Sequence, residues 1–120
     1  MIQQPPTTTN VTIANGAATS GAFRLHEWLF GTVFVPDSWT DANIGFKVCA
    51  EESGTYVVAK DSSGSPLQIS GINTTTGAAY ALPTSIFAFP YVKLWSKNTT
   101  AATETDNNQT GAKILTVFLK

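Results

Sequence analysis

The stretch that decides the fold is LFGTVFVPDSWTDANIGFKVCA, from Leu29 to Ala50. Every second residue of Ile44–Ala50 is apolar, and this period of two predicts a half-buried β-strand. Leu29–Val35 is apolar on both faces, which is typical of a strand in the middle of a packed sandwich. Pro36-Asp37-Ser38 ends that strand, and we expect Trp39 to fold back over the end of the sheet.

The rest of the chain repeats this pattern of short strands separated by turns. Asn15-Gly16 is a strong turn dipeptide, and Asp61–Pro66 has the composition of a second turn. The last segment, Ala112–Lys120, is apolar on both faces and is expected to be a central strand that pairs with segments far back in the sequence. Because no helical period is present, the sequence predicts an all-β, single-domain β-sandwich of the jelly-roll type.

Two polar segments are predicted to lie outside the strands. Residues 1–10 are expected to form an extended arm, since Pro5-Pro6 favours a polyproline-like backbone, and residues 11–120 are expected to form the sandwich. Lys97–Gly111 has no apolar anchor and is expected to be a long exposed loop. The first ten residues also lack the basic and apolar regions of a signal peptide.

The composition excludes several classes of partner. Only 12% of the 120 residues are charged and the formal net charge is −1, so the chain has no basic footprint for nucleic acid or for an anionic membrane surface. No apolar run reaches the length of about 20 residues that a membrane-spanning helix needs. The single cysteine, Cys49, cannot form an internal disulfide and is expected to be a structural thiol.

The sequence offers little for catalysis. His26 and Cys49 are the only residues from which a Cys–His dyad could be built, and both fall on predicted strands. Glu51 and Glu52 are adjacent in a turn, so their carboxylates point apart. Three oxygen-bearing side chains have a spacing seen among calcium ligands, although one turn of mixed acids is more often only a turn: Asp37, Asp41 and Asn43. We therefore expect no enzyme activity, no cofactor and no bound metal.

Aromatic residues leave a sugar-binding function open. Six side chains offer stacking faces: Trp28, Trp39, Trp95, Tyr56, Tyr80 and Tyr91. In a sandwich of this size, Trp residues lie more often in the core or at a subunit interface. A secreted, glycosylated domain is a further alternative, because four Asn-x-Ser/Thr patterns occur, at Asn10, Asn73, Asn98 and Asn108.

Four stretches resemble small structural proteins of tailed-bacteriophage virions. These are VTIANGAATSGAFRL from Val11, LFGTVFVPDSWTDANIGFKVCAEESGTYVVAKDSSGSPLQI from Leu29, FPYVKLWSKN from Phe89 and ILTVFLK from Ile114. In such proteins an opening like TIANG…SG is followed by a strand, a P-x-x-W-T turn, a hairpin and a terminal apolar strand. The resemblance covers most of the chain from Val11 onward.

The resemblance implies a decoration or cement protein that sits on the outside of the head shell, usually as a homotrimer. Its partner would be the major capsid protein, and it would reach the capsid surface after synthesis in the cytoplasm of the bacterial host. Pro5 and Pro6 of the arm would contact a neighbour or the shell, and Trp28, Phe30 and Trp95 would lie at the subunit interface. The alternative is a carbohydrate-binding module of a phage tail or receptor-binding protein, with a glycan as ligand.

Overall fold

The computed structural model describes residues 5–100 and 104–120. Within these residues, nine strands and one short 3-10 helix follow one another. They are β1 (Thr7–Ile13), β2 (Thr19–Arg24), β3 (Gly31–Val35), β4 (Asn43–Cys49), β5 (Val57–Val58), β6 (Gln68–Ile69), β7 (Ala78–Ala81), η1 (Thr84–Ala88), β8 (Tyr91–Lys97) and β9 (Lys113–Leu119).

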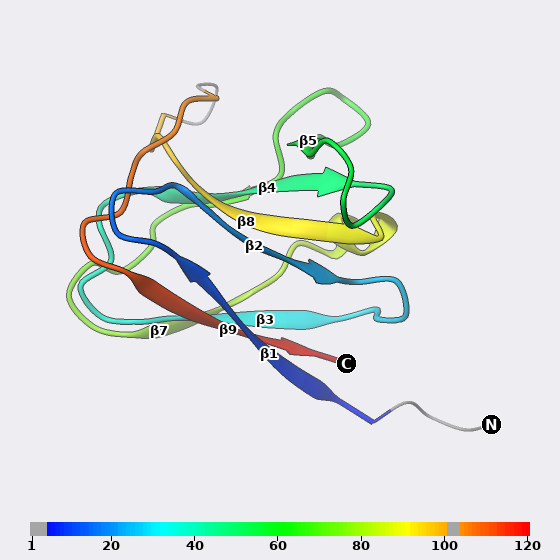
Figure 1. Cartoon of the computed structure of the whole chain (residues 1–120), viewed down its shortest axis with the longest axis horizontal. Helices are drawn as coiled ribbons and strands as arrows, with labels where there is room; N and C mark the ends of the chain where they lie inside the picture. The colour runs from blue at the N-terminus through cyan, green and yellow to red at the C-terminus, as the bar shows by residue number, and fades with distance from the viewer. Residues whose placement is uncertain (1–4, 101–103) are drawn as a thin grey trace.

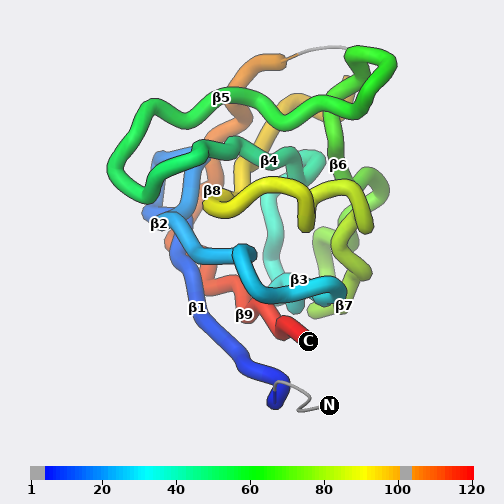
Figure 2. The backbone as a smooth tube through the Cα atoms, turned by 90° about the vertical axis from the view of Figure 1, so that its right-hand side faces the viewer, coloured from blue at the N-terminus to red at the C-terminus, as the bar shows by residue number. Residues whose placement is uncertain are grey.

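The strands form two sheets that pack face to face (Figures 1 and 2). Sheet A has the order β1-β9-β3-β7, and sheet B has the order β2-β8-β4-β5 with β6 also paired to β4. All of these strand pairs are antiparallel. The chain is therefore a β-sandwich, as the sequence predicts.

The pairing pattern identifies the sandwich as a jelly roll. β1 pairs with β9, β2 with β8, β3 with β7, and β4 with β5, so the first half of the chain pairs with the second half in reverse order. The chain thus behaves as one long antiparallel hairpin that is wrapped into two sheets. This topology confirms the predicted fold class, and it places the C-terminal strand between β1 and β3, as its two-sided apolar sequence predicts.

The core lies between the two sheets and is built from every second residue of the central strands. Leu115, Val117 and Leu119 of β9 are buried from the sheet A side. Ile44–Val48 of β4 presents alternate residues from the sheet B side, and the predicted inner face of this strand is confirmed. At about 25 cal/mol per Å² of apolar surface removed from water, such side chains supply most of the stability of the fold.

The two ends of the sandwich are closed by apolar side chains from loops. Trp39 is buried, and its indole Nε1 donates a hydrogen bond of 3.1 Å to the Ala42 carbonyl oxygen, so the prediction that it covers the end of a sheet is confirmed. Ile86 of η1 is fully buried. No helix in the described part of the chain is long and apolar enough to cross a membrane.

The predicted arm is shorter than expected. Thr7–Asn10 belong to β1 and pair in register with residues 116–119 of β9, so the strand begins four residues before the predicted boundary of the sandwich. Three consecutive Thr residues suit a strand because β-branched side chains pack well on a pleated surface. Pro5 and Pro6 precede the strand and are exposed, whereas residues 1–4 of the predicted arm lie outside the described residues.

The predicted loop Lys97–Gly111 is not free of anchors. Gln109 is 1% exposed, and its side chain accepts a hydrogen bond from the Thr40 amide and donates to the Thr40 carbonyl oxygen and to Ser96 Oγ. Its backbone also bonds to Gly16 and Ala17 at the β1–β2 turn. A buried polar side chain with all of its partners takes the place of the apolar anchor that the sequence lacks.

The position of β9 can be tested with two neighbouring residues that face opposite ways. We expect Leu115→Ala to lower the free energy of unfolding by about 2–5 kcal/mol because it opens a cavity in the core. Ile114→Ala, on the exposed face of the same strand, should cost less than about 1 kcal/mol. Urea unfolding at a protein concentration that keeps the chain monomeric measures both, and equal losses would contradict the assigned register.

Gln109 and its neighbour Asn108 provide a second matched pair. Gln109→Ala leaves the Thr40 amide without its side-chain partner and should lower the free energy of unfolding by roughly 2–4 kcal/mol. Asn108 is exposed, so Asn108→Ala should change the same quantity by less than about 0.5 kcal/mol. If the two variants were equally stable, the hydrogen bonds of Gln109 would not hold this end of the sandwich.

Candidate functional site

The outer surface of sheet A, the side turned away from sheet B, is formed by uncharged strand residues. The register fixes its members, since residues that alternate with the buried ones must point outward. We call this surface the open face; its strand residues are Thr8, Asn10, Thr12, Thr32, Phe34, Ala79, Ala81, Ile114, Thr116 and Phe118.

These outward residues form rows across the sheet. Thr8, Phe118, Thr32 and Ala81 are successive partners in one row, and Asn10, Thr116, Phe34 and Ala79 are partners in the next. Within the second row the Thr116 hydroxyl donates a hydrogen bond of 2.8 Å to Asn10 Oδ1. The face is therefore an ordered array of hydroxyl, methyl and aromatic groups without a formal charge.

Large apolar side chains are exposed on this face and at its edge. Phe34 of β3 is 48% exposed and Ile114 of β9 is 58% exposed, although both belong to paired strands. Leu29 and Phe30 precede β3 and are 70% and 61% exposed, and their backbone amides bond to the Lys120 carbonyl oxygen beside the end of β9. In the part of the chain that the structure describes, one further large apolar side chain is as exposed, Val57 on sheet B.

A recess of about 270 Å³ borders the open face where β3, β7 and β9 meet η1. Phe30, Leu82, Phe87 and Phe118 contribute its apolar lining, and Lys120 is the charged residue at its rim. The open face therefore has both an apolar recess and exposed apolar side chains of the kind that can fill such a recess on another molecule.

Such a surface has the chemistry of a protein interface. Interface cores are depleted of charged residues and enriched in aromatic ones, and exposed apolar patches on soluble proteins mark interaction sites. The strand residues of the open face carry no formal charge, since Lys113 of β9 is buried and Lys120 lies at the rim of the recess. Near sheet B, by contrast, Lys60 and Glu104 form an ion pair of 3.0 Å. The strand residues of the open face can therefore be buried against a partner without desolvating a charge.

The structure separates the residues that the sequence predicts for an interface. Phe30 lies at the edge of the open face, and Pro5 and Pro6 are exposed ahead of β1. Trp28 is half-buried and packs against the core. Of these four residues, Phe30 is the one that offers a large exposed apolar surface next to the open face.

Trp95 is not at a surface, so its predicted place at a subunit interface is wrong for this fold. It is 1% exposed, and its indole Nε1 donates a hydrogen bond of 2.7 Å to Asp106. The side chain lies on the outer side of sheet B, opposite Gly45, and the Lys47 ammonium sits 4.8 Å from the centre of its ring. The segment after β8, which contains Asp106, covers this side chain. The alternating pattern of β8 does not predict that cover.

A buried lysine lies next to Trp95. Lys97 Nζ donates a hydrogen bond of 2.7 Å to Gln68 Oε1, which also accepts a hydrogen bond from Asn43 Nδ2. Burial lowers the pKa of the Lys97 ammonium, and the Glu104 carboxylate partly opposes that shift. With its partners on β4, β6 and the segment after β8, Lys97 serves to fix the loop over sheet B.

Two of the six expected sugar-stacking residues are buried, and the other four are half-buried. Trp39 and Trp95 are buried, so neither can offer a ring to a ligand. The Tyr80 hydroxyl accepts a hydrogen bond from the Asn73 amide, and the Tyr56 hydroxyl donates to the Glu52 carbonyl oxygen. Burial, followed by nearby acidic groups, raises the pKa of Tyr56.

Neither a metal centre nor a nucleophilic site stands out among the described residues. Over residues 5–100 and 104–120, no group of three or more His, Cys, Asp or Glu side chains is placed to hold a metal ion. Cys49 is half-buried at the end of β4, and its sulfur accepts a hydrogen bond of 3.5 Å from the Glu51 amide. The arrangement is that of a structural thiol in a turn.

The sequence contains a pattern that indicates the open face, but this pattern has two structural interpretations. Phe34, Ile114 and Phe118 lie in the two segments that are apolar on both faces. Such strands are either buried on both sides or cover the core with one side and present an interface with the other. In the structure Phe34 and Ile114 are exposed, so Leu29–Val35 is central in its sheet without being covered on both sides.

The fold and the open face together define a jelly-roll protein with an uncharged, partly apolar outer surface on sheet A. The crystal structure of SPBc2 prophage-derived protein YomS has a similar fold: the TM-score is 0.51 at 15% sequence identity, over 99% of this chain and 97% of that one. No protein-family model matches the chain, and a search of curated proteins gave no match. At this identity the likeness supports the jelly-roll fold.

Proposed function

We propose that this chain is a structural protein of a bacteriophage particle that decorates the head shell. The observation that carries the proposal is the open face, where aromatic and β-branched side chains are exposed on a rigid sheet without a formal charge. The resemblance of four stretches to virion proteins and the fold shared with a prophage-derived protein support the same context.

The open face forms the contact between copies of the chain in a homotrimer. A closed ring of three uses head-to-tail contacts, in which each subunit contributes two different surfaces. The recess beside Leu82 at one end of the open face and the exposed Ile114 near the other end of β9 provide such a pair, because an apolar side chain of one copy can enter the recess of the next. Contact between uncharged surfaces also avoids the cost of placing like charges opposite one another.

The mechanism is mechanical. A rigid oligomer that binds the major capsid protein on neighbouring capsomers adds contacts that exist only in the assembled, expanded shell. Anything that binds one state of an equilibrium and not the other stabilises the state that it binds, so these contacts oppose rupture of the shell. The paired strands and the polar network around Gln109 keep the subunit rigid enough to carry load between its contacts.

The solution mass tests the association step. Size exclusion with light scattering should give a trimer of the 12.8 kDa chain. Phe34→Asp places a charge on the open face and should produce a monomer that unfolds like the wild-type chain does at concentrations low enough to keep that chain monomeric. Val57→Asp introduces the same charge at a similarly exposed site on sheet B and should leave the trimer intact. A monomeric wild-type chain, or a Phe34→Asp variant that is still trimeric, would contradict the proposed contact.

Co-sedimentation with phage heads tests the decoration step. The chain should bind expanded heads and not unexpanded ones, and the Phe34→Asp variant should bind less tightly because a single subunit makes fewer simultaneous contacts. Equal binding to both forms of the head, or none to either, would argue against a decoration role even if the trimer forms.

A further inference from the structure

Three polar side chains meet on the outer side of sheet B, where β4 pairs with β8 on one side and with β6 on the other. The Lys97 ammonium of β8 donates a hydrogen bond of 2.7 Å to Gln68 Oε1 of β6. The same oxygen accepts a hydrogen bond of 3.2 Å from Asn43 Nδ2 of β4. Lys97 and Asn43 are both buried. A buried amine is therefore held in contact with the carbonyl group of a side-chain amide.

Gly45 opens the path that Lys97 takes to reach Gln68. It lies on β4 with Gln68 as its partner on one side and Trp95 as its partner on the other. A Cβ atom at Gly45 would lie 2.8 Å from Lys97 Cδ and 2.8 Å from a carbon of the Trp95 ring, which is too close for either contact to remain. Gly inside a strand often marks such a close approach. The Lys97 side chain therefore crosses β4 over Gly45 and reaches a strand that β8 does not pair with.

The surroundings of Lys97 favour its reaction as a nucleophile. Burial lowers the pKa of the Lys97 ammonium, and the Glu104 carboxylate opposes that shift only in part, so a larger fraction of the amine is neutral. Desolvated lysines of this kind attack carbonyl carbons. The Asn43 N–H polarises the Gln68 carbonyl and is placed to stabilise negative charge that develops on Oε1. Since Gln68 Cδ is bonded to the contacted oxygen, a rotation of the amide can bring it to the attack distance of about 3–3.5 Å.

From this arrangement we infer that Lys97 and Gln68 form an intramolecular isopeptide bond. The neutral Lys97 amine attacks, a bond forms between Lys97 Nζ and Gln68 Cδ, and the bond between Gln68 Cδ and Nε2 breaks. One proton passes from Nζ to the leaving nitrogen, which departs as ammonia. No oxidant, cofactor or second protein is consumed. The product replaces a buried amine with a neutral amide, which removes the cost of keeping an ammonium away from water.

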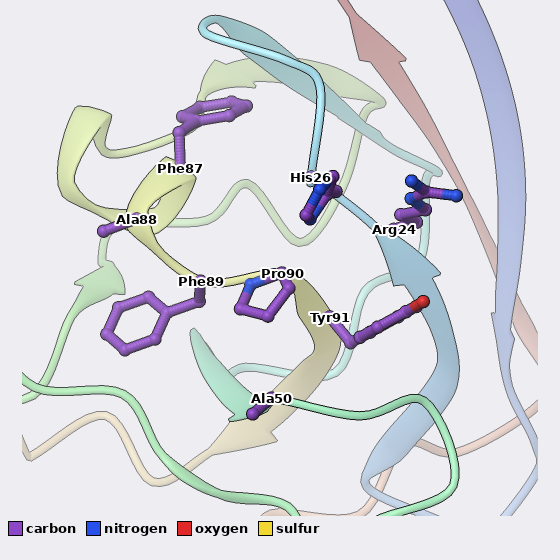
Figure 3. A pocket seen from close by; sticks show the side chains of 8 residues that line it. All are labelled: Arg24, His26, Ala50, Phe87, Ala88, Phe89, Pro90 and Tyr91. Atoms are coloured by element: carbon purple, nitrogen blue, oxygen red, sulfur yellow. The ribbon is translucent and has the colours of Figure 1, made fainter.

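The reacting groups line neither of the two hollows described in this fold. One is the recess beside the open face, and the other, of about 500 Å³, lies where β2 ends and η1 leads into β8 (Figure 3). In Figure 3 the rings of Phe87, Phe89 and Tyr91 point in different directions and do not surround one space. The inferred reaction therefore joins two side chains of the same chain and requires no bound ligand.

The cross-link fastens a strand that has few backbone contacts. β6 is joined to β4 through two residue pairs, Ile44 with Ile69 and Gly45 with Gln68. A covalent bond from β6 to β8 closes a loop and restricts the unfolded chain, as a disulfide does. The inference goes beyond the structural role proposed above and does not depend on it, because the bond lies in sheet B and the open face lies on sheet A.

Intact-mass spectrometry of the purified 120-residue chain, denatured after incubation to constant mass, tests the bond. The mass should be lower than that of the sequence by one ammonia, and proteolysis should yield a branched peptide that joins Lys97 to Gln68. Cyclisation of Asn15 at the Asn15-Gly16 dipeptide also releases ammonia, so the branched peptide locates the reaction. A chain that keeps its sequence mass, or one whose lost ammonia maps to Asn15, overturns the inference.

Three variants identify the reacting groups. Lys97→Met keeps an unbranched apolar chain over Gly45 but has no amine, so it should not form the branched peptide. Lys93→Met, on the same strand and the same side of sheet B, is the matched control and should form it as the wild-type chain does. Asn43→Ala removes the donor to Oε1 and should slow the loss of ammonia about tenfold or more. Failure of Lys93→Met to react, or an unchanged rate in Asn43→Ala, would contradict the assigned roles, and the wild-type measurement decides the bond whether or not the variants fold.

Discussion

The register of β9 between β1 and β3 is the constraint on which the rest of this structure depends. Because side chains alternate along a strand, the pairing that buries Leu115, Val117 and Leu119 also turns Ile114 and Phe118 outward. A slip of one residue would expose the core residues and bury the others. The same pairing joins the end of the chain to its beginning, so the core and the open face are fixed by one set of backbone hydrogen bonds.

A second constraint acts at the end of the sandwich near the β1–β2 turn. There the Gln109 side chain bonds to Thr40 and Ser96, and its backbone bonds to Gly16 and Ala17. Three other segments, around Gly16, Thr40 and Ser96, are therefore tied together by one buried residue. Polar networks of this kind, when every group is satisfied, specify a single arrangement more strictly than apolar packing does. The described residues leave no buried side-chain polar atom without a hydrogen bond.

The sequence predicted the features that follow from alternation and could not predict those that depend on distant partners. The inner face of β4, the buried Trp39 and the central place of β9 were predicted correctly because each is a property of a local pattern. The start of β1 was placed too late, because Thr7–Asn10 form a strand only through their pairing with β9. Polar composition alone does not distinguish an extended arm from a strand at the edge of a sheet.

Two residues show the same limit in the prediction of the site. Alternation placed Trp95 on the outer side of β8, but segments from elsewhere in the chain cover it, and Asp106 accepts its N–H. Phe34 was expected to be covered on both sides of its sheet and is instead 48% exposed. Trp95 was expected at a surface and is buried, whereas Phe34 was expected to be covered and is exposed. Both errors have one cause, because no local sequence pattern records which outer surface of a sandwich a loop will cover.

The two outer surfaces of the sandwich therefore differ in how far loops cover them. On sheet B, the loop after β8 lies over Trp95, and ion pairs such as Lys60–Glu104 hold loops against the sheet. On sheet A, the strand residues remain uncovered although Phe34 and Ile114 are large and apolar. Exposed apolar patches on soluble proteins mark interaction sites. The described strand residues of the open face combine such side chains with the absence of charge, and this combination is the observation behind the contact between copies proposed above.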